Sequence, residues 1–249
     1  MLLFNKLNWP FTHADTFTFY KRIAEQYNDQ AILDYVHKLI PKEVSKASDN
    51  GQSLKPLLHW FKTDFMKWMP KEIGCATCAE INSSSNGSNR TMIVQTIEGD
   101  SKILRRSEIH ICTKCGSHII FPRYIKIVNI ADTRIGRCSE WSILFGAILN
   151  SLSIQTRIVH DFLDHCWNES LIYNKWIHID STLDYPICYN HPYYYEQNWG
   201  KKYEYVLGFS ASTLEDVTRC YTENWDTVQK RRGRRKDKLA EFKTIYLKL

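Results

Sequence analysis

Four of the eight cysteines in this 249-residue chain fall into two Cys-x-x-Cys pairs. Cys75 and Cys78 form the first pair, and Cys112 and Cys115 form the second after 33 intervening residues. Each pair offers two soft thiolate ligands on one tight turn, and Zn²⁺ prefers four such ligands in a tetrahedron. The spacing therefore predicts one closed, structural Zn²⁺ site. Free or disulfide-bonded cysteines are the alternative.

A fifth cysteine, Cys138, has no such partner and lies in the run Gly136-Arg137-Cys138-Ser139-Glu140-Trp141, at the start of an apolar helical pattern. Unpaired N–H groups and the macrodipole at a helix start favour a thiolate. The same N–H groups can supply part of an oxyanion hole. A thiolate nucleophile also needs a histidine that moves the proton and an acid or amide that orients the histidine.

Two histidines follow at suitable places, His165 and His178. They fall on two successive predicted strands that form a hairpin, and the side chains of each strand alternate between its faces. A turn centred near Ile172-Tyr173 sets His165 opposite Asp180, with the two Cβ atoms roughly 5 Å apart. The sequence therefore favours Cys138, His165 and Asp180 as a catalytic group, although each residue alone is more often structural.

The elements that must position these residues are read from hydrophobic periodicity. Residues 12–70 predict helices, the last of which covers Leu54–Met69 and ends at Pro70. Strands are predicted over Thr91–Ile97 and Ser107–Cys112, around the metal ligands. The rest of the pattern predicts a helix over Ser139–Leu152, strands over Thr156–Asp161, His165–Leu171 and Lys175–Asp180, and a return to helix from Phe209.

These elements divide the chain into three parts. Residues 1–70 form an N-terminal helical region, 71–121 a zinc-binding module, and 122–249 a catalytic core with a C-terminal helix. A hydrophobic share of 43% is ample for a buried core in a chain of this length.

The formal net charge of +6 is concentrated in one run. Lys230 to Lys238 holds seven basic residues and one acid, and the remainder of the chain is balanced. Such a run can bind nucleic acid or serve as a nuclear signal. Because a balanced remainder argues against a broad nucleic-acid-binding surface, we interpret the run as a solvated helix face and expect no nucleic-acid partner.

The amino terminus has no secretory signal pattern, and the sequence has no apolar run of membrane-spanning length. We therefore expect a cytoplasmic or nuclear protein without a membrane partner. In that compartment cysteines stay reduced and bind metal or do chemistry.

Over roughly residues 54–235, the order of motifs resembles that of the cytoplasmic peptide:N-glycanases, members of the transglutaminase-like superfamily. The matching motifs are Leu57-Leu58-His59-Trp60-Phe61-Lys62-Thr63-Asp64-Phe65, both cysteine pairs, Phe121-Pro122-Arg123-Tyr124, the run around Cys138, Asp164-His165-Cys166-Trp167, Lys175-Trp176-Ile177-His178-Ile179-Asp180 and Asp216-Val217-Thr218-Arg219.

This resemblance implies an α+β fold, with a transglutaminase-like (papain-like) cysteine-hydrolase core, an antiparallel sheet, a zinc-binding module and N-terminal helices. It makes Cys138 the nucleophile, His165 the general base and acid, and Asp180 the residue that orients the histidine. The substrate-contact candidates that it implies are Trp167, Trp176, Glu169, Glu140 and Trp141.

The resemblance also implies the reaction, which is hydrolysis of the amide bond between N-acetylglucosamine and an asparagine side chain. The expected substrates are misfolded or denatured N-glycoproteins, and the expected context is ER-associated degradation. A ubiquitin-receptor shuttle protein and the proteasome are the partners that it implies.

Two departures from the family are visible. Ser139 stands where the family usually has glycine, and the N-terminal adaptor and C-terminal sugar-binding domains of longer relatives are missing from this sequence, which we therefore expect to be a minimal core. The alternatives are a transglutaminase or cysteine peptidase that acts on plain peptides, and an inactive relative that binds nucleic acid or a repair partner.

Overall fold

The computed structural model describes residues 13–47, 54–70, 90–95, 104–112, 115–233 and 238–249. The helices are α1 (His13–Gln26), α2 (Gln30–His37), α3 (Lys42–Ala47), α4 (Lys55–Trp60), the π-helical turn η3 (Phe61–Phe65), α5 (Ile127–Thr133), α6 (Cys138–Ser151), α7 (Tyr194–Trp199), the 3₁₀ turn η5 (Thr218–Tyr221), α8 (Trp225–Arg232) and α9 (Lys238–Lys248). The strands are β1 (Lys67–Trp68), β2 (Arg90–Gln95), β3 (Leu104–Cys112), β4 (His118–Tyr124), β5 (Ile135–Gly136), β6 (Thr156–His160), β7 (Cys166–Ile172), β8 (Lys175–Ile179), β9 (Leu207–Phe209) and β10 (Leu214–Asp216).

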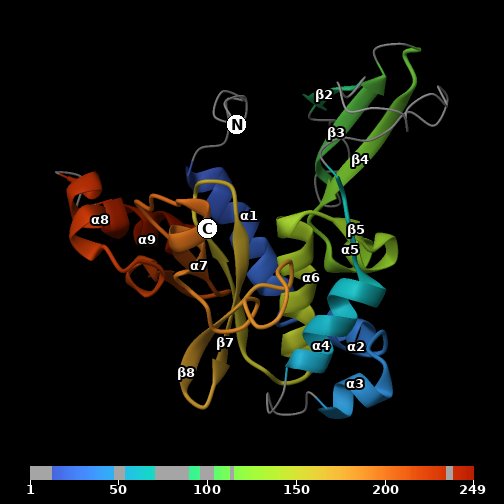
Figure 1. Ribbon diagram of the computed structural model, residues 1–249, viewed down its shortest axis with the longest axis horizontal. Coiled ribbons are helices and arrows are strands. Elements are labelled where there is room, and N and C mark those ends of the chain that lie inside the picture. Colours follow the sequence, from blue (N-terminus) through green and yellow to red (C-terminus); the bar gives the residue numbers. More distant parts are fainter. Residues whose placement is uncertain (1–12, 48–53, 71–89, 96–103, 113–114, 234–237) are drawn as a thin grey trace.

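A five-stranded antiparallel sheet in the order β10-β9-β6-β7-β8 forms one layer of the core. Helix α6 packs on β6 and β7, and helices α2 and α5 cover its other side. Figure 1 shows α6 in the middle of the molecule, between the sheet and helices α2 and α4. Every residue of α6 from Glu140 to Leu149 is buried, as expected for a helix that is enclosed by protein. The expected α+β fold with an antiparallel sheet is confirmed.

The hairpin between β7 and β8 has a different register from the predicted one. Tyr173 and Asn174 both have positive φ angles, of 49° and 59°, and form a two-residue turn. Glu169 therefore pairs with His178, and Asn168 pairs with Ile179. This register is displaced by two residues from the predicted one, which set His165 opposite Asp180. The turn lies one residue later than Ile172-Tyr173, and because this moves the pairing by two residues, the face of each side chain is unchanged.

The predicted helix over Leu54–Met69 is wrong only in its last turn, after Phe65. The α-helix ends at Trp60, one π-helical turn follows, and Met66 adopts an extended conformation. The chain then runs parallel to β5, with the N–H of Lys67 donating to Arg134 O at 2.8 Å. Pairing with the segment just before Cys138 therefore replaces the last helical turn.

The three-stranded antiparallel sheet β2-β3-β4 projects from the rest of the molecule in Figure 1. Strands β2 and β3 agree with the two strands predicted in this region, but β4 and the following helix α5 were not predicted.

The prediction of helix from Phe209 onward is wrong for the first part of that segment. Ser210 N donates to Thr213 O at 2.9 Å, which closes a tight turn between β9 and β10. Helices begin only with η5, α8 and α9. Within the polybasic run, Arg232 is buried and its guanidinium contacts Asp216 at 2.7 Å. At least one charge of this run is therefore structural.

Among the helices in the described ranges, none is long and apolar enough to cross a membrane.

Candidate active site

Cys138 is the first residue of α6 and is half-buried. Strand β5 delivers the chain to this point, and its Gly136 lies against the helix so closely that a Cβ atom there would be 2.3 Å from the Cβ of Glu140. The Glu140 carboxylate accepts the backbone N–H of Arg137 at 3.0 Å and so caps the helix start. The nucleophile candidate is therefore fixed at a well-ordered helix end.

His165 lies at the end of a loop that Asp161 organises. One carboxylate oxygen of Asp161 accepts the backbone N–H groups of Leu163, Asp164 and His165 at 2.9, 3.0 and 3.0 Å. Its other oxygen accepts from Lys201 Nζ at 2.7 Å. The same loop brings the carbonyl oxygen of Asp164 to 3.7 Å from Cys138 Sγ. Asp161 thus holds the loop that places His165 beside the thiol.

Asp180 receives four hydrogen bonds through its buried carboxylate. Oδ2 accepts from His165 Nε2 at 2.7 Å and from the Tyr195 hydroxyl at 2.8 Å. Oδ1 accepts from the backbone N–H of Thr182 at 2.9 Å and from its hydroxyl at 2.7 Å. Because Nε2 is occupied by Asp180, the ring nitrogen that faces Cys138 is Nδ1. The structure brings all three predicted catalytic residues together.

His178, the other histidine candidate, has a different environment. Its Nε2 donates to the Tyr195 hydroxyl at 2.6 Å, since that hydroxyl donates onward to Asp180, and its Nδ1 accepts the His191 N–H at 3.3 Å. Burial lowers the pKa of His178 to about 4, so the ring is neutral. It supports Tyr195 beneath the site.

The electrostatics of the site favour a charged thiolate–imidazolium pair. A hydrogen bond from Cys166 and, against the opposing effect of burial, hydrogen bonding to His165 hold the pKa of Cys138 well below its usual range. Burial alone would lower the pKa of His165, but the charge and hydrogen bond of Asp180 raise it to about 10. At neutral pH the thiol is therefore ionised and the imidazole is protonated.

A buried cluster of four charged residues joins β3 and β4 to the start of α6. Arg123 Nε donates to Glu140 at 2.7 Å, and its Nη1 donates to Glu108 at 2.6 Å. Arg137 contacts the other oxygen of Glu108 at 2.8 Å. Arg123 Nη2 also donates to the Ser139 hydroxyl at 3.1 Å, so the residue that departs from the family has a defined partner. We name these four residues the arginine–glutamate cluster.

The substrate-contact candidates lie below the surface. Trp167, Glu169, Glu140 and Trp141 are all buried, and only Trp176 is partly exposed. Trp167, Glu169 and Glu140 hydrogen-bond to protein groups, of which Glu140 contacts Arg123. Trp167 Nε1 donates to Tyr221 and Arg157 donates to Glu169, each at 2.7 Å. The Arg157 guanidinium stacks 4.0 Å from the Trp176 ring centroid. Their role as substrate contacts stays a prediction.

Trp199 is a neighbour of the site that no sequence pattern indicated. It ends α7, keeps 42% of its surface exposed, and its ring centroid lies 5.1 Å from that of His165. Cys166, Asp161 and Arg123 were also not assigned roles, although Cys166 and Arg123 fall within the quoted motifs. The contacts of these residues join segments that are far apart in the sequence, and hydrophobic periodicity does not predict such contacts.

The second cysteine pair lies where β3 turns into β4. Gly116 N donates to Cys112 O at 2.9 Å, and Gly116 has a positive φ of 73°, which completes a tight turn. Such a turn fits a zinc knuckle that contributes two thiolates. Cys75 and Cys78 lie outside the described residues.

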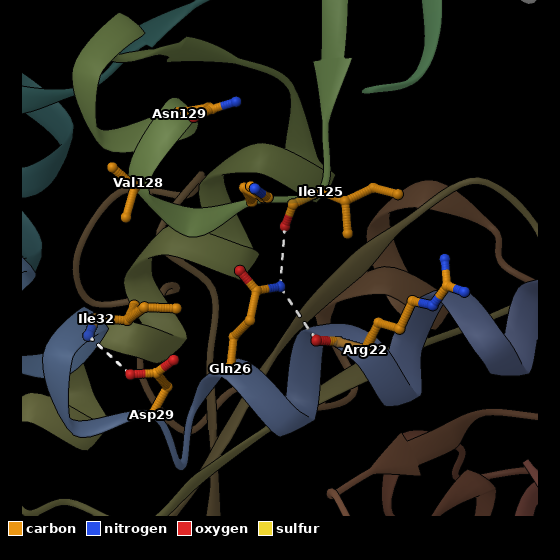
Figure 2. Close-up of a pocket in the computed structure, with 8 residues that line it drawn as sticks. Arg22, Gln26, Asp29, Ile32, Ile125, Val128 and Asn129 are labelled. Carbon is orange, nitrogen blue, oxygen red and sulfur yellow. Dashed lines mark hydrogen bonds between the residues drawn. The ribbon is translucent and has the colours of Figure 1, made fainter. Parts of the chain in front are cut away.

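A pocket of about 560 Å³ lies away from the candidate residues, between α1, the start of α2 and α5 (Figure 2). Gln26 spans it. Its Nε2 donates to Ile125 O at 3.2 Å and to Arg22 O at 3.1 Å, and its Oε1 accepts from Ile127 N at 3.0 Å. These bonds join α1 to the start of α5, which packs on α6, so we interpret this region as structural.

Residues 91–181 match the family model of the transglutaminase-like superfamily, and this segment contains Cys138, His165 and Asp180. With the antiparallel sheet and the helix that begins at the cysteine, the match defines a transglutaminase-like domain.

The curated relatives of this chain point to one group within the transglutaminase-like superfamily. The peptide-N(4)-(N-acetyl-beta-glucosaminyl)asparagine amidase of Yarrowia lipolytica is 36% identical over 225 residues, which cover 82% of this chain and 60% of that protein. Its namesake in Caenorhabditis elegans is 33% identical over 217 residues, covering 82% of this chain and 34% of the relative. That of Saccharomyces cerevisiae is 34% identical over 198 residues, covering 76% and 53%. The chain belongs to the peptide:N-glycanase family, and it spans about one third to three fifths of the length of these relatives.

Proposed function

We propose that this protein hydrolyses the amide bond between N-acetylglucosamine and an asparagine side chain in N-glycoproteins, converting the asparagine to aspartate. The observation that carries the proposal is the thiolate–imidazolium–carboxylate arrangement of Cys138, His165 and Asp180, in a chain whose relatives are named for this amidase activity.

Cys138 attacks the asparagine side-chain carbonyl carbon. Backbone N–H groups in the first turn of α6 have no partner within the helix, and they stabilise the oxyanion that forms. His165 Nδ1–H protonates the departing glycosylamine. The neutral ring then accepts a proton from water, which attacks the thioester and releases aspartate. Asp180 keeps the ring oriented throughout. The glycosylamine decays to free glycan and ammonia.

A structural Zn²⁺ held by Cys75, Cys78, Cys112 and Cys115 completes the proposal. Four thiolates close the shell of the metal, so it would supply no reactive water and would act by holding the β2–β4 region together. The tight turn at Cys112 and Cys115 supports this assignment. By this proposal, 71–121 is a zinc-binding module.

We further propose that the substrate is unfolded around its glycosylated asparagine, because the half-buried Cys138 requires the side chain to be drawn inward. A role in ER-associated degradation, a cytoplasmic or nuclear location, and a ubiquitin-receptor shuttle protein and the proteasome as partners stay predictions. So do the absence of a nucleic-acid or membrane partner and the three domain boundaries.

The test is incubation of native and denatured, reduced glycoprotein with the purified protein, with peptide mass used to detect conversion of asparagine to aspartate. We expect conversion to be much faster in the denatured form than in the native form. Cys138→Ala and His165→Ala should abolish conversion with the fold intact, and Cys220→Ser, which alters an exposed thiol, should not. Conversion by Cys138→Ala would refute the nucleophile assignment. Cleavage of plain peptides without loss of glycan would favour the peptidase alternative.

A further inference from the structure

A second thiol, that of Cys166, lies directly against the nucleophile candidate. Asp164 O is 3.7 Å from Cys138 Sγ, and Cys166 Sγ is 3.3 Å from Ser142 Oγ. Ser142 follows Cys138 by one helical turn and so lies on the same face of α6. The segment 164–166 therefore runs along this face, and the thiols of Cys138 and Cys166 lie within hydrogen-bonding reach.

The mechanism leaves Cys166 without a chemical step. Its side chain is 2% exposed, and it belongs to neither Cys-x-x-Cys pair. At the first position of β7, its backbone pairs with His160 of β6. An apolar side chain of similar size would fill this place but would lose the hydrogen bonds of the thiol to Ser142 and Cys138. A thiol can in addition react with an oxidised Cys138, which an apolar side chain cannot do.

We propose that Cys138 and Cys166 form a site of reversible oxidative modification, in which a peroxide oxidises Cys138 and Cys166 resolves the product as an intramolecular disulfide. The inference rests on the proposed function only in naming Cys138 as the reactive thiolate.

The chemistry balances in two steps. The Cys138 thiolate attacks one oxygen of hydrogen peroxide, the O–O bond breaks, and the released hydroxide takes up a proton to become water. Cys138 is thereby oxidised by two electrons to a sulfenic acid. The Cys166 thiol then attacks this sulfur, the S–S bond forms, the S–O bond breaks, and the hydroxyl leaves as water with the Cys166 proton.

The two cysteines have the different properties that such a pair requires. Cys138 is partly exposed and ionised, so peroxide reaches a good nucleophile. Cys166 is buried, and its hydrogen bond to Cys138 and its burial raise its pKa, so it stays protonated and is not oxidised first. The buried thiol therefore reacts only after Cys138 has changed. Without it, the sulfenic acid would be oxidised further to an irreversible sulfinic acid.

The test exposes the whole, reduced chain to hydrogen peroxide, and reads intact mass, a non-reduced peptide map and amidase activity before and after dithiothreitol. We expect the wild type to lose two hydrogen atoms, to link the peptides of Cys138 and Cys166, and to recover its activity with dithiothreitol. Cys166→Ser should gain two oxygen atoms on Cys138 and stay inactive after reduction. Cys220→Ser, which alters an exposed thiol, should behave as the wild type does.

The peptide map of the wild type decides the question even if Cys166→Ser folds poorly. A map in which Cys138 carries a sulfinic acid and Cys166 stays a free thiol would overturn the proposal. So would disulfides confined to the two Cys-x-x-Cys pairs. Because the map needs no glycoprotein substrate, a protein that forms the disulfide but lacks amidase activity would refute the proposed function alone.

Discussion

Replacing Asp180 with asparagine tests how the candidate triad works. The Thr182 N–H can only donate, so the amide oxygen of the new residue must keep the place of Oδ1. The amide nitrogen then takes the place of Oδ2 and donates to His165 Nε2, where the carboxylate accepted. The neutral ring must carry its proton on Nδ1, which faces Cys138. A ring in this tautomer cannot accept the thiol proton.

The size of the expected change in alkylation rate follows from the pKa of the Cys138 thiol. In the wild type, the pKa of Cys138 lies well below its usual range because of its hydrogen bonds to Cys166 and to protonated His165. Without an imidazolium neighbour, the thiol keeps the hydrogen bond from Cys166 but loses the contribution of His165, so its pKa rises towards the ordinary value of about 8.5. A thiol with that ordinary pKa is about 1% ionised at about pH 6.5, so alkylation by iodoacetamide should be slower in Asp180→Asn by up to about 100-fold at this pH, with the two proteins converging near pH 9. The kcat for glycopeptide should fall by about 10²- to 10⁴-fold.

The assay is the alkylation rate of Cys138 as a function of pH, followed by peptide mass, together with glycopeptide turnover. Asp216→Asn is the matched control, because Asp216 also forms a largely buried ion pair, with Arg232, but contacts none of the three candidate residues. It should leave the alkylation profile unchanged. An Asp180→Asn protein that alkylates at the wild-type rate in mildly acidic solution would refute the reasoning.

Three further outcomes are expected. Gly136→Ala should lower the free energy of unfolding by about 1–3 kcal/mol in urea titrations, because its Cβ would overlap that of Glu140; wild-type stability would contradict the close approach. Burial lowers the pKa of both His160 and His178 to about 4. The unfolded chain therefore binds up to two more protons between about pH 6.5 and 4, and stability should fall by up to about 3 kcal/mol per pH unit as pH drops through this range; a flat urea midpoint would argue against neutral, buried rings. Metal analysis should find one Zn²⁺ per chain, and chelation should remove it with loss of strand signal in circular dichroism, whereas a Cys112→Ser protein that still holds one equivalent would sink the ligand assignment.

The parts of the fold that sequence reasoning predicted are those with a local period. The helix that starts at Cys138 and the strands around it have strong apolar patterns, and the face of each strand follows from alternation alone. The register was wrong because Asn174, a residue that tolerates positive φ, marks the turn one residue later than assumed. The predicted sheet face of each side chain was still correct, because the pairing moved by an even number of residues.

Long-range electrostatics could not be predicted in this way. Glu108 lies 15 residues from Arg123 and 29 from Arg137, and no spacing rule links them. The same limit applies to Glu169. Its partner Arg157 lies on the neighbouring strand, and only the folded sheet shows that the two side chains are in contact.

The low pKa of Cys138 depends on residues from distant segments, among them Arg123 of the arginine–glutamate cluster, and this has a consequence for the order in which the site assembles. Cys138 owes its low pKa to Cys166, His165 and Arg123, which lie on both sides of it in the chain. A nascent or refolding chain that has completed only α6 lacks these three contacts, so its Cys138 thiol is less ionised and reacts more slowly than in the folded protein. The reactive thiolate appears after the β7–β8 hairpin has docked. Alkylation in mildly acidic solution during refolding would thus time the closure of the site, and a fast alkylation phase that coincides with helix formation would contradict this order.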